Sequence, residues 1–409
     1  MKRRDFLKNM TFDATGLAAL IIMVISGCSG PKEPEIFIDI DKKLQYSAAT
    51  VRQSLAGLSV EEGFPRRVNQ GEYRWSNTRY TGWTSGFFPG LLWNLYTFTG
   101  DDELKQAAIA YTNALEPITR MDWNTHDLGF MMYLSAGKAY EHTQDAIYRQ
   151  WLMETADSLA DLFNPVVGTI HSWPWGERRH GWPHNTIIDN MLNLEFLFWA
   201  ANNGGGEHLR DIAITHTHTT LRNGFRNDFS TWHVIVYEKD SPNVIKKITD
   251  QGYSDESVWS RGQAWAMHGF SMAYRETGIA EFLDVAVAAS EFFIDHLPDD
   301  FVPYWDFMLP DTAGQPRDAS AAAIAASALV ELSTLVDDQE VSSHFLETAQ
   351  QMIRSLFENY RSEETMAILG HSTGSKPHDS EIDVPLVYAD YYFIEALMRM
   401  RNGELRMKN

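Results

Sequence analysis

The 409-residue sequence predicts an all-α fold in which six helical hairpins close into an α/α toroid within a single domain. From residue 40 onward the dominant pattern is helical periodicity with many small residues, and there is little of the Val/Ile alternation that marks β-strands. Six segments open with a polar or aromatic turn and continue into a helix that is apolar or small on nearly every side, and amphipathic stretches lie between them. A helix that is apolar all round is buried, whereas a helix with one apolar stripe lies outside with its charged face in water. The alternation therefore predicts two concentric layers of helices.

The inner layer is predicted from the six apolar segments and the outer layer from the amphipathic ones. The inner segments are residues 84–96, 127–140, 189–201, 261–274, 318–332 and 390–400. The outer segments are residues 103–115, 148–163, 207–225, 280–297 and 342–359. Hairpins make all inner helices point the same way, so their N-terminal ends meet at one rim. Five charged residues collect there: Asp127, Asp189, Arg261, Asp318 and Asp390. An open helical solenoid is the alternative, but the repeats lack its fixed period and polar end caps.

Two of these residues, Asp127 and Asp189, lie where a loop turns into an apolar helix. An acid at a helix start is often only a cap that accepts backbone N–H groups and offsets the positive end of the helix dipole. Both residues, however, follow loops that carry His and Trp, in a chain with 13 Trp, 16 Tyr and 22 Phe. Indole faces stack on sugar C–H surfaces and the indole N–H reaches a hydroxyl, although the same rings also serve as core at a barrel mouth. We interpret the pair as the carboxylates of a carbohydrate-cleaving site.

Net charge and the absence of metal-ligand motifs argue against nucleic-acid binding and against a metal site. The 34 basic and 55 acidic residues give a formal net charge of −21, which disfavours nucleic acid as a partner. His216 and His218 are two residues apart and do not share a helix face, and neither a Cys partner nor a His-Glu-x-x-His motif accompanies them. We therefore expect no metal site and no cofactor.

The N-terminal segment predicts export. A basic start, an apolar run over residues 16–25 and then Ile25-Ser26-Gly27-Cys28 follow the order of a secretory signal, and residues 25–28 resemble a bacterial lipobox. Arg3-Arg4 also resembles a twin-arginine signal. The alternative is an uncleaved anchor, but about ten apolar residues are too few to span a bilayer. We expect a signal peptide over residues 1–27, lipidation of Cys28, a tether over 28–38 and the barrel domain over 39–409. The lipid anchor would make the chain an exported lipoprotein of the periplasm or outer membrane.

Four segments carry a resemblance to a known family. They are residues 81–90, residues 126–130, residues 188–194, and residues 251–254 continued through 260–265. Together they resemble the unsaturated glucuronyl hydrolases of glycoside hydrolase family 88, over roughly residues 40–405. The resemblance implies a catalytic (α/α)6 barrel. It also implies an anionic substrate, namely an oligosaccharide left by a polysaccharide lyase, whose non-reducing end is a uronate with a C4=C5 double bond.

The chemistry that the resemblance implies is hydration of a vinyl ether. Protonation of C4 places positive character on C5, water adds at C5, and the resulting hemiketal opens and releases the aglycone. By the resemblance, Asp189 is the acid that returns as a base and Asp127 is the second carboxylate. Apolar neighbours such as Ile188 and Met191 would raise the pKa of Asp189 by excluding water, whereas a helix N-terminus would lower it. The sequence leaves open which effect is larger.

The resemblance also implies substrate-binding residues. Trp173, His233, Gln251, Arg261 and Trp265 match family positions by motif. Arg261 or His233 would pair with the uronate or with polar ring groups, and either Trp would stack on the ring. The alternative for Arg261 is a structural bond to an Asp or Glu.

A further candidate binding residue is Lys376, which lies in the loop of residues 370–378 together with two histidines. In a chain short of cations, this loop suits sulfate or uronate recognition. The alternative is a solvated turn.

Three other functions compete. An unsaturated rhamnogalacturonyl hydrolase would share the fold and chemistry but act on pectin fragments. A non-catalytic glycan-binding lipoprotein would keep the Trp residues but need neither aspartate. A conventional inverting glycosidase on the same barrel would act on saturated sugars.

Overall fold

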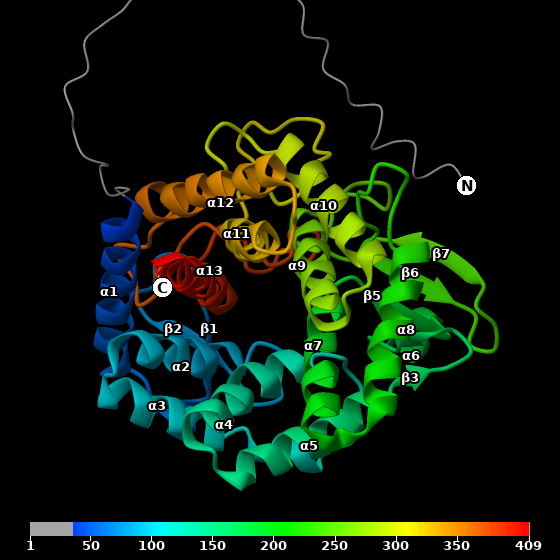
Figure 1. Ribbon diagram of the computed structural model, residues 1–409, viewed down its shortest axis with the longest axis horizontal. Coiled ribbons are helices and arrows are strands. Elements are labelled where there is room, and N and C mark those ends of the chain that lie inside the picture. Colours follow the sequence, from blue (N-terminus) through cyan, green and yellow to red (C-terminus); the bar gives the residue numbers. More distant parts are fainter. Residues whose placement is uncertain (1–35, 409) are drawn as a thin grey trace, which may run out of the picture. The chain divides into compact units, whose positions relative to one another are not determined.

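The computed structural model describes residues 36–408, and within them six inner helices form a closed ring (Figure 1). The inner helices are α2 (Phe87–Thr99), η3 (Gly129–Gly137), α7 (Asn190–Ala200), α9 (Ser260–Thr277), α11 (Ala319–Ser333) and α13 (Val387–Lys408). Each packs on the next in this order, and α13 packs back on α2. The closed ring confirms the predicted toroid and excludes the open solenoid.

A second layer of helices surrounds this ring. The outer helices are α1 (Ile36–Leu55), α3 (Asp102–Asn113), α5 (Ala146–Ala160), α8 (Glu207–Asn223), α10 (Ala280–Asp295) and α12 (Gln339–Asn359). Shorter helical turns join the layers: η1 (Val60–Glu62), η2 (Glu116–Arg120), α4 (Lys138–Thr143), α6 (Gly176–His180) and η4 (Ala201–Gly205). The all-α barrel expected from periodicity is therefore confirmed.

The contrast between the layers follows from their side chains. Every residue of α11 is buried, and its alanines let the neighbouring helices approach closely. The outer helices α3, α5 and α12 start with an aspartate whose side chain accepts a backbone N–H of the first turn: Asp101, Asp145 and Asp338. Charged faces thus belong to the outer layer, as the amphipathic pattern indicates.

The sixth outer helix, α1, had not been singled out from the sequence. It packs beside α12 and α13: the Tyr46 ring meets the Phe357 ring edge-on at 5.3 Å, and Arg401 Nε donates to Asp41 Oδ1 at 2.8 Å. With α1 in place, the outer layer is complete.

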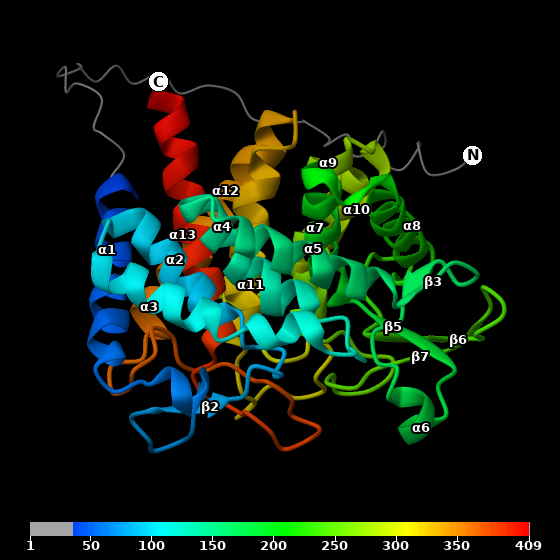
Figure 2. The ribbon, with the colours of Figure 1, turned by 90° about the horizontal axis from the view of Figure 1, so that it is seen from below.

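Small antiparallel sheets at one end of the barrel were not expected. The first pairs β1 (Phe64–Val68) with β2 (Trp75–Thr78), the second pairs β3 (Phe163–Asn164) with β4 (Thr169–Ile170), and the third has the order β5 (His184–Ile187), β6 (Val234–Tyr237) and β7 (Val244–Ile248). These strands have two to five residues each, too short to give a clear alternation. The side view places the loops and strands at the end where the inner helices begin (Figure 2).

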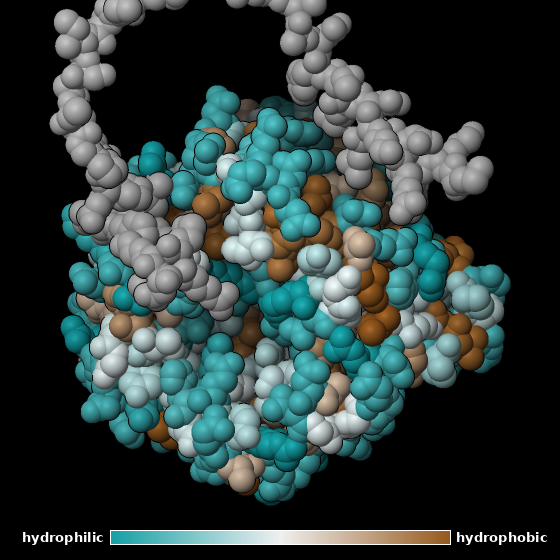
Figure 3. All heavy atoms as spheres, viewed as in Figure 1, coloured by the Kyte–Doolittle hydropathy of each residue, from teal (hydrophilic) through white to brown (hydrophobic). Residues whose placement is uncertain are grey.

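The opposite end of the barrel, where the inner helices finish, is largely hydrophilic and hollowed near its middle (Figure 3). None of the helices in residues 36–408 has the length and hydrophobicity needed to cross a membrane. The predicted signal peptide, the lipidation site Cys28 and most of the predicted tether lie outside the described residues.

Candidate active site

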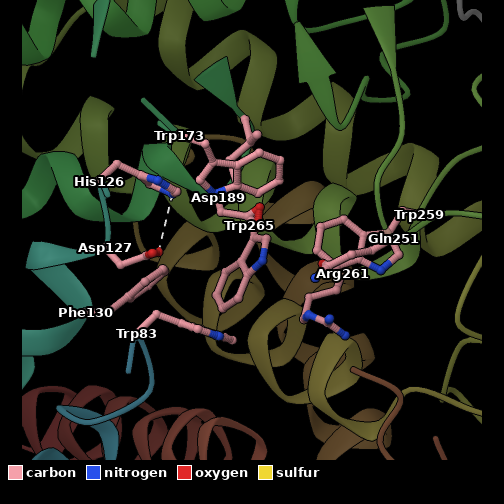
Figure 4. Close-up of a pocket in the computed structure, with 11 residues that line it drawn as sticks. Trp83, His126, Asp127, Phe130, Trp173, Asp189, Gln251, Trp259, Arg261 and Trp265 are labelled. Carbon is pink, nitrogen blue, oxygen red and sulfur yellow. Dashed lines mark ion pairs between the residues drawn. The ribbon is translucent and has the colours of Figure 1, made fainter. Parts of the chain in front are cut away.

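Loops that lead into the inner helices enclose a pocket of about 90 Å³ at the rim (Figure 4). Its lining combines aromatic rings with a few polar groups, as in ligand sites generally. The lining residues are Trp83, His126, Asp127, Phe130, Trp173, Ile187, Asp189, Gln251, Trp259, Arg261 and Trp265. The rim predicted from helix direction therefore does bring both aspartates to one cavity.

Asp189 lies between β5 and α7, but it does not cap the helix. Its side chain makes no capping hydrogen bond, and its buried Oδ2 has no partner among the described residues. Burial raises the pKa of Asp189 to about 7, with Arg261 opposing this shift and Asp127 adding to it. Desolvation is therefore the largest influence on the pKa of Asp189, and it exceeds the lowering by Arg261 and by a backbone hydrogen bond. Near neutral pH this carboxyl can both hold and release a proton.

The sheet β5–β6–β7 holds His233 against Asp189. The pairing of Ile187 with Val234 continues into a hydrogen bond from the Ile188 N–H to the His233 carbonyl at 3.0 Å. His233 Nδ1 accepts the backbone N–H groups of Asp250 at 3.2 Å and Gln251 at 3.3 Å. These bonds assign the proton of the neutral ring to Nε2.

That Nε2 atom lies 3.9 Å from Asp189 Oδ2. Neither of these two buried atoms has a hydrogen-bond partner among the described residues. Burial lowers the pKa of His233 to about 3, with Arg261 adding to the shift, so the ring is neutral at neutral pH. His233 is thus a neutral N–H donor placed to stabilise Asp189 when that carboxyl becomes negative.

Asp127 is positioned by the two residues that precede it in the sequence. The Thr125 hydroxyl donates to Asp127 Oδ2, and His126 Nε2 lies 3.5 Å from Asp127 Oδ1. His126 Nδ1 donates to the Ser172 carbonyl at 3.1 Å, which ties this loop to the loop that precedes Asp189. Because Nδ1 carries the proton of the neutral ring, Nε2 and Asp127 Oδ1 are both acceptors. A hydrogen bond between them needs a further proton on the imidazole or on the carboxylate.

Arg261 lines the pocket and also fixes the C-terminal loop. It is 2% exposed, and Nη1 donates to Asp318 Oδ2 at 2.5 Å and to the Thr373 carbonyl at 2.6 Å. Nη2 donates to the Gly374 carbonyl at 2.5 Å. The pairing with an acid, the alternative considered from sequence, is therefore present. The guanidinium lies over the Trp259 ring at 4.5 Å, so it contributes positive charge to the pocket without being free to move.

The other predicted binding residues differ in whether they line the pocket. Trp173 and Gln251 line the pocket, and Trp265 lines it while being only 1% exposed. The Trp265 ring packs between Phe130 at 5.5 Å and Tyr392 at 5.4 Å, so it serves the core as well. His233 lies behind Asp189 and is not one of the residues lining the pocket.

Lys376 does not line the pocket either. The loop is nevertheless not a simple solvated turn, because residues 372–375 are buried. The Gly374 backbone N–H donates to the Glu381 carbonyl at 2.7 Å. Glu381 in turn pairs with Arg66 and Arg67. The loop is thus held at the rim, with the half-buried Lys376 at its edge.

Two further aspartates that the sequence placed on the rim are structural. Asp318 caps α11 by accepting the N–H groups of Ser320 and Ala321. Asp390 accepts those of Ile368 and Leu369. Neither lines the pocket.

Four lining residues were not assigned a role from the sequence: Trp83, His126, Phe130 and Trp259. A further lining residue, Ile187, is one of the apolar neighbours of Asp189 that were expected to exclude water. Each of the four lies within, or next to, a segment that carried the family resemblance, and all but Trp83 lie within three residues of Asp127 or Arg261.

The histidine pair that had been considered for a metal has structural contacts. His216 Nδ1 accepts the Ile170 N–H at 3.0 Å, and His218 Nδ1 lies 3.9 Å from Glu281. Residues 36–408 contain no group of three or more His, Cys, Asp or Glu side chains arranged to hold a metal ion.

The fold and the pocket define a carbohydrate-active barrel enzyme, and comparison with known proteins gives its family. The model for Glycosyl Hydrolase Family 88 matches residues 59–402. An unsaturated glucuronyl hydrolase of Formosa agariphila is 41% identical over 367 residues, which cover 88% of this chain and 90% of that protein. An unsaturated chondroitin disaccharide hydrolase of Streptococcus agalactiae is 34% identical and covers 78% and 81% of the two chains.

A solved structure of an unsaturated glucuronyl hydrolase specific for heparin agrees with a TM-score of 0.85 at 39% identity, over 90% of this chain and 98% of that one. The chain belongs to glycoside hydrolase family 88 and is an enzyme.

Proposed function

We propose that this enzyme removes the 4,5-unsaturated uronic acid from the non-reducing end of oligosaccharides produced by polysaccharide lyases, with glycosaminoglycan fragments as the substrate class. The observation that carries the proposal is Asp189, a carboxyl with a pKa of about 7 that lines an aromatic pocket and whose Oδ2 has no hydrogen-bond partner within residues 36–408. The names of its relatives support the substrate class.

The reaction begins with proton transfer from the Asp189 carboxyl to C4 of the unsaturated ring. This leaves positive character on C5 and the ring oxygen, which the negative charge of Asp127 stabilises. Asp189 is now a carboxylate, and the His233 Nε2–H at 3.9 Å is placed to donate to it. The carboxylate then takes a proton from water as the water oxygen bonds to C5, so Asp189 regains its proton. The hemiketal opens, and the aglycone leaves with its oxygen as an alcohol.

The Arg261 guanidinium supplies the positive charge that the substrate carboxylate requires. Trp259 and Asp318 already hold this guanidinium in place, so substrate binding costs little conformational entropy at Arg261. Indole rings of Trp83 and Trp173 form the walls on which the sugar stacks.

The direct test is incubation with unsaturated disaccharides from chondroitin, hyaluronan, heparin and pectin lyases, followed by the ultraviolet absorbance of the conjugated ene-carboxylate. Loss of absorbance with a glycosaminoglycan disaccharide is expected. Turnover of only the pectin product would instead identify a rhamnogalacturonyl hydrolase, which the named relatives do not favour. Turnover of saturated glycosides alone would identify a conventional glycosidase.

We also propose that the chain is exported and anchored by lipid at Cys28, on the basis of its basic, apolar and lipobox-like N-terminal segments. An exported lipoprotein would act on glycan fragments in the periplasm or at the outer membrane. Metabolic labelling with a radioactive fatty acid tests this: labelled wild-type protein and unlabelled Cys28→Ser protein are expected. Equal labelling of both would contradict the proposal.

A further inference from the structure

A separate cavity lies at the opposite end of the barrel from the catalytic pocket. It encloses about 380 Å³ where the inner helices finish, and residues of α2, η3, α4, α7 and α13 line it. The space-filling view shows a hollow near the middle of this end (Figure 3). The two cavities share no lining residue, so the far one can bind a different molecule from the substrate.

The charged groups at this cavity carry a net negative charge. Four carboxylates share two guanidiniums in one connected network: Glu195, Glu276, Glu331 and Glu395 with Arg275 and Arg399. His268 Nε2 lies 3.0 Å from Glu395 Oε2 and adds at most one positive charge, so the network is negative in either protonation state of that ring. Burial opposes ionisation of Glu395, but Arg399 and His268 more than offset it and lower its pKa, so this carboxylate is charged at neutral pH.

The cationic side chains that line the cavity are already paired. Arg399 Nη1 donates to Glu331 Oε2 at 2.7 Å, and Lys138 Nζ donates to Glu141 Oε2 at 3.0 Å. Burial lowers the pKa of His142, so its ring adds no positive charge at neutral pH. An anion would have to compete with these carboxylates for each cation, whereas a cation would find carboxylate oxygens with capacity to spare.

Two carboxylate oxygens at the cavity have that capacity. Glu195 Oε1 accepts from Arg275 at 2.5 Å, but Glu195 Oε2 accepts no hydrogen bond from the described residues. Glu395 Oε2 accepts from the Ser327 hydroxyl at 2.6 Å, whereas Oε1 has only the Tyr391 hydroxyl at 3.5 Å. Both residues line the cavity, so both oxygens are available to a donor inside it.

A buried amide also lines the cavity without a partner. Asn94 lies in the apolar helix α2 and is 8% exposed, and its side chain makes no hydrogen bond within residues 36–408. A buried amide without a hydrogen bond costs free energy, and a polar ligand in the cavity relieves that cost. Asn94 is therefore an observation independent of the acidic network, and it points to the same ligand position.

The kind of cation follows from the arrangement of these groups. No set of three or more His, Cys, Asp or Glu side chains in the described part of the chain is placed to hold a metal ion. The available acceptors are instead spread along the cavity wall on α2, α7 and α13. A flexible molecule with several N–H donors matches spread acceptors better than a compact ion does.

We infer that this cavity is a binding site for a small organic cation with protonated amino groups, of the linear polyamine type. The ammonium groups donate to Glu195 Oε2, Glu395 Oε1 and Asn94 Oδ1, and the carbon chain lies against Leu134 and Met398. This binding activity goes beyond the proposed function, because none of these residues lines the catalytic pocket.

The test is isothermal titration calorimetry of the whole protein with spermidine, a linear triamine. We expect saturable binding of a single spermidine per chain. Glu195→Gln should weaken this binding about tenfold, because it removes one of the two carboxylates that face the amine. Arg275 keeps its other carboxylate partners in this variant, so the fold should be retained. Glu103→Gln is the matched control: it removes the same charge at an exposed position outside the cavity and should change the affinity less than about twofold.

A second variant separates ligand binding from structural support. Asn94→Leu replaces the unpartnered amide with an apolar side chain of similar shape, so the melting temperature of the unliganded protein should stay the same or rise. The affinity for spermidine should nevertheless fall about threefold, since one acceptor is lost. A lower melting temperature with unchanged affinity would show that Asn94 has a structural role only, and would overturn its place in the site.

Three other results would overturn the site itself. Absence of spermidine binding to the wild-type protein would mean that the cavity holds only water. Equal weakening by Glu195→Gln and Glu103→Gln, or equally tight binding of Mg²⁺, would mean that the chain, with its net charge of −21, attracts cations without a defined site. None of these measurements uses an unsaturated saccharide, so the outcome is independent of the proposed function.

Discussion

Asp189 and Asp390 are two buried carboxyls at the start of inner helices, and burial raises the pKa of each to about 7. They differ in their partners. Asp390 accepts the Ile368 and Leu369 N–H groups at 2.9 Å and 2.8 Å, and so uses both oxygens to hold a loop. Asp189 Oδ2 has no hydrogen-bond partner in the part of the chain that the structure describes, and the residue faces a pocket. The raised pKa therefore shows only that both carboxyls are buried. The acid that can exchange a proton is identified by an oxygen that faces a cavity and makes no hydrogen bond to the described residues.

The largest expected difference between the two positions is in turnover. Asp189→Asn removes the proton that is transferred to C4, so kcat should fall at least about a thousandfold while substrate binding remains measurable. Asp390→Asn should keep kcat within about threefold, because its side chain touches neither the pocket nor its lining loops. The ultraviolet assay with one glycosaminoglycan disaccharide measures both. Near-normal turnover of Asp189→Asn would sink its assignment as the acid.

A smaller effect is expected from the group that faces Asp189. His233→Ala removes the neutral N–H donor at 3.9 Å and leaves the newly formed carboxylate without a stabilising partner. We expect kcat to fall about a hundredfold, in line with loss of one fixed donor to a developing charge. The high-pH limit of activity should also move upward, since the ionised form of Asp189 loses its donor. A change in KM alone would show that His233 only shapes the pocket.

The two carboxyls should also differ in their effect on how kcat/KM depends on pH. Asp189 must be protonated at the start of the reaction, so kcat/KM should fall about tenfold per pH unit above its pKa of about 7. His233, with a pKa of about 3, does not change its charge in this range. Asp390→Asn should leave the high-pH limb where it is, although Asp390 titrates near the same pH. A limb that moved in the Asp390→Asn protein would contradict the comparison.

The sequence predicts the barrel well because its two kinds of helix differ in hydrophobic pattern. Inner segments such as residues 318–332 are apolar on all sides, and they became α11 and its neighbours. The common direction of hairpin helices then places Asp127 and Asp189 at one rim. The short strand Val234–Tyr237 was not predicted, because four buried residues give no alternation. That strand is what brings His233 to Asp189.

The hydrogen-bond and ion-pair partners of a side chain are harder to predict from sequence than its position at the rim. Asp189, Asp318 and Asp390 look alike in sequence, since each is an acid at the start of an apolar helix. Only the fold shows that Asp318 caps α11 and pairs with Arg261, that Asp390 holds a loop, and that Asp189 does neither. Lys376 shows the same limit, because a cation in a rim loop need not reach the pocket that the loop borders.

The smallest expected effect is on stability, and it differs between the two positions. A carboxyl whose folded pKa is raised binds more protons in the folded state, so its presence lowers stability as pH rises from about 4 to about 7. Asp189→Asn removes this penalty and breaks no side-chain hydrogen bond to the residues that the structure describes. The variant should unfold at roughly 2 °C higher temperature at pH 8 and show no gain at pH 4.

Asp390→Asn removes the same penalty but replaces one accepting oxygen with an amide that faces a backbone N–H. Leaving that buried donor unpaired costs about 1–3 kcal/mol, so the melting temperature should fall below that of the wild type at pH 4, where no penalty is relieved. Thermal unfolding of both variants at pH 4 and pH 8 measures the contrast. Equal shifts at the two positions would mean that Asp189 has a structural partner after all, and that its free oxygen does not mark the catalytic acid.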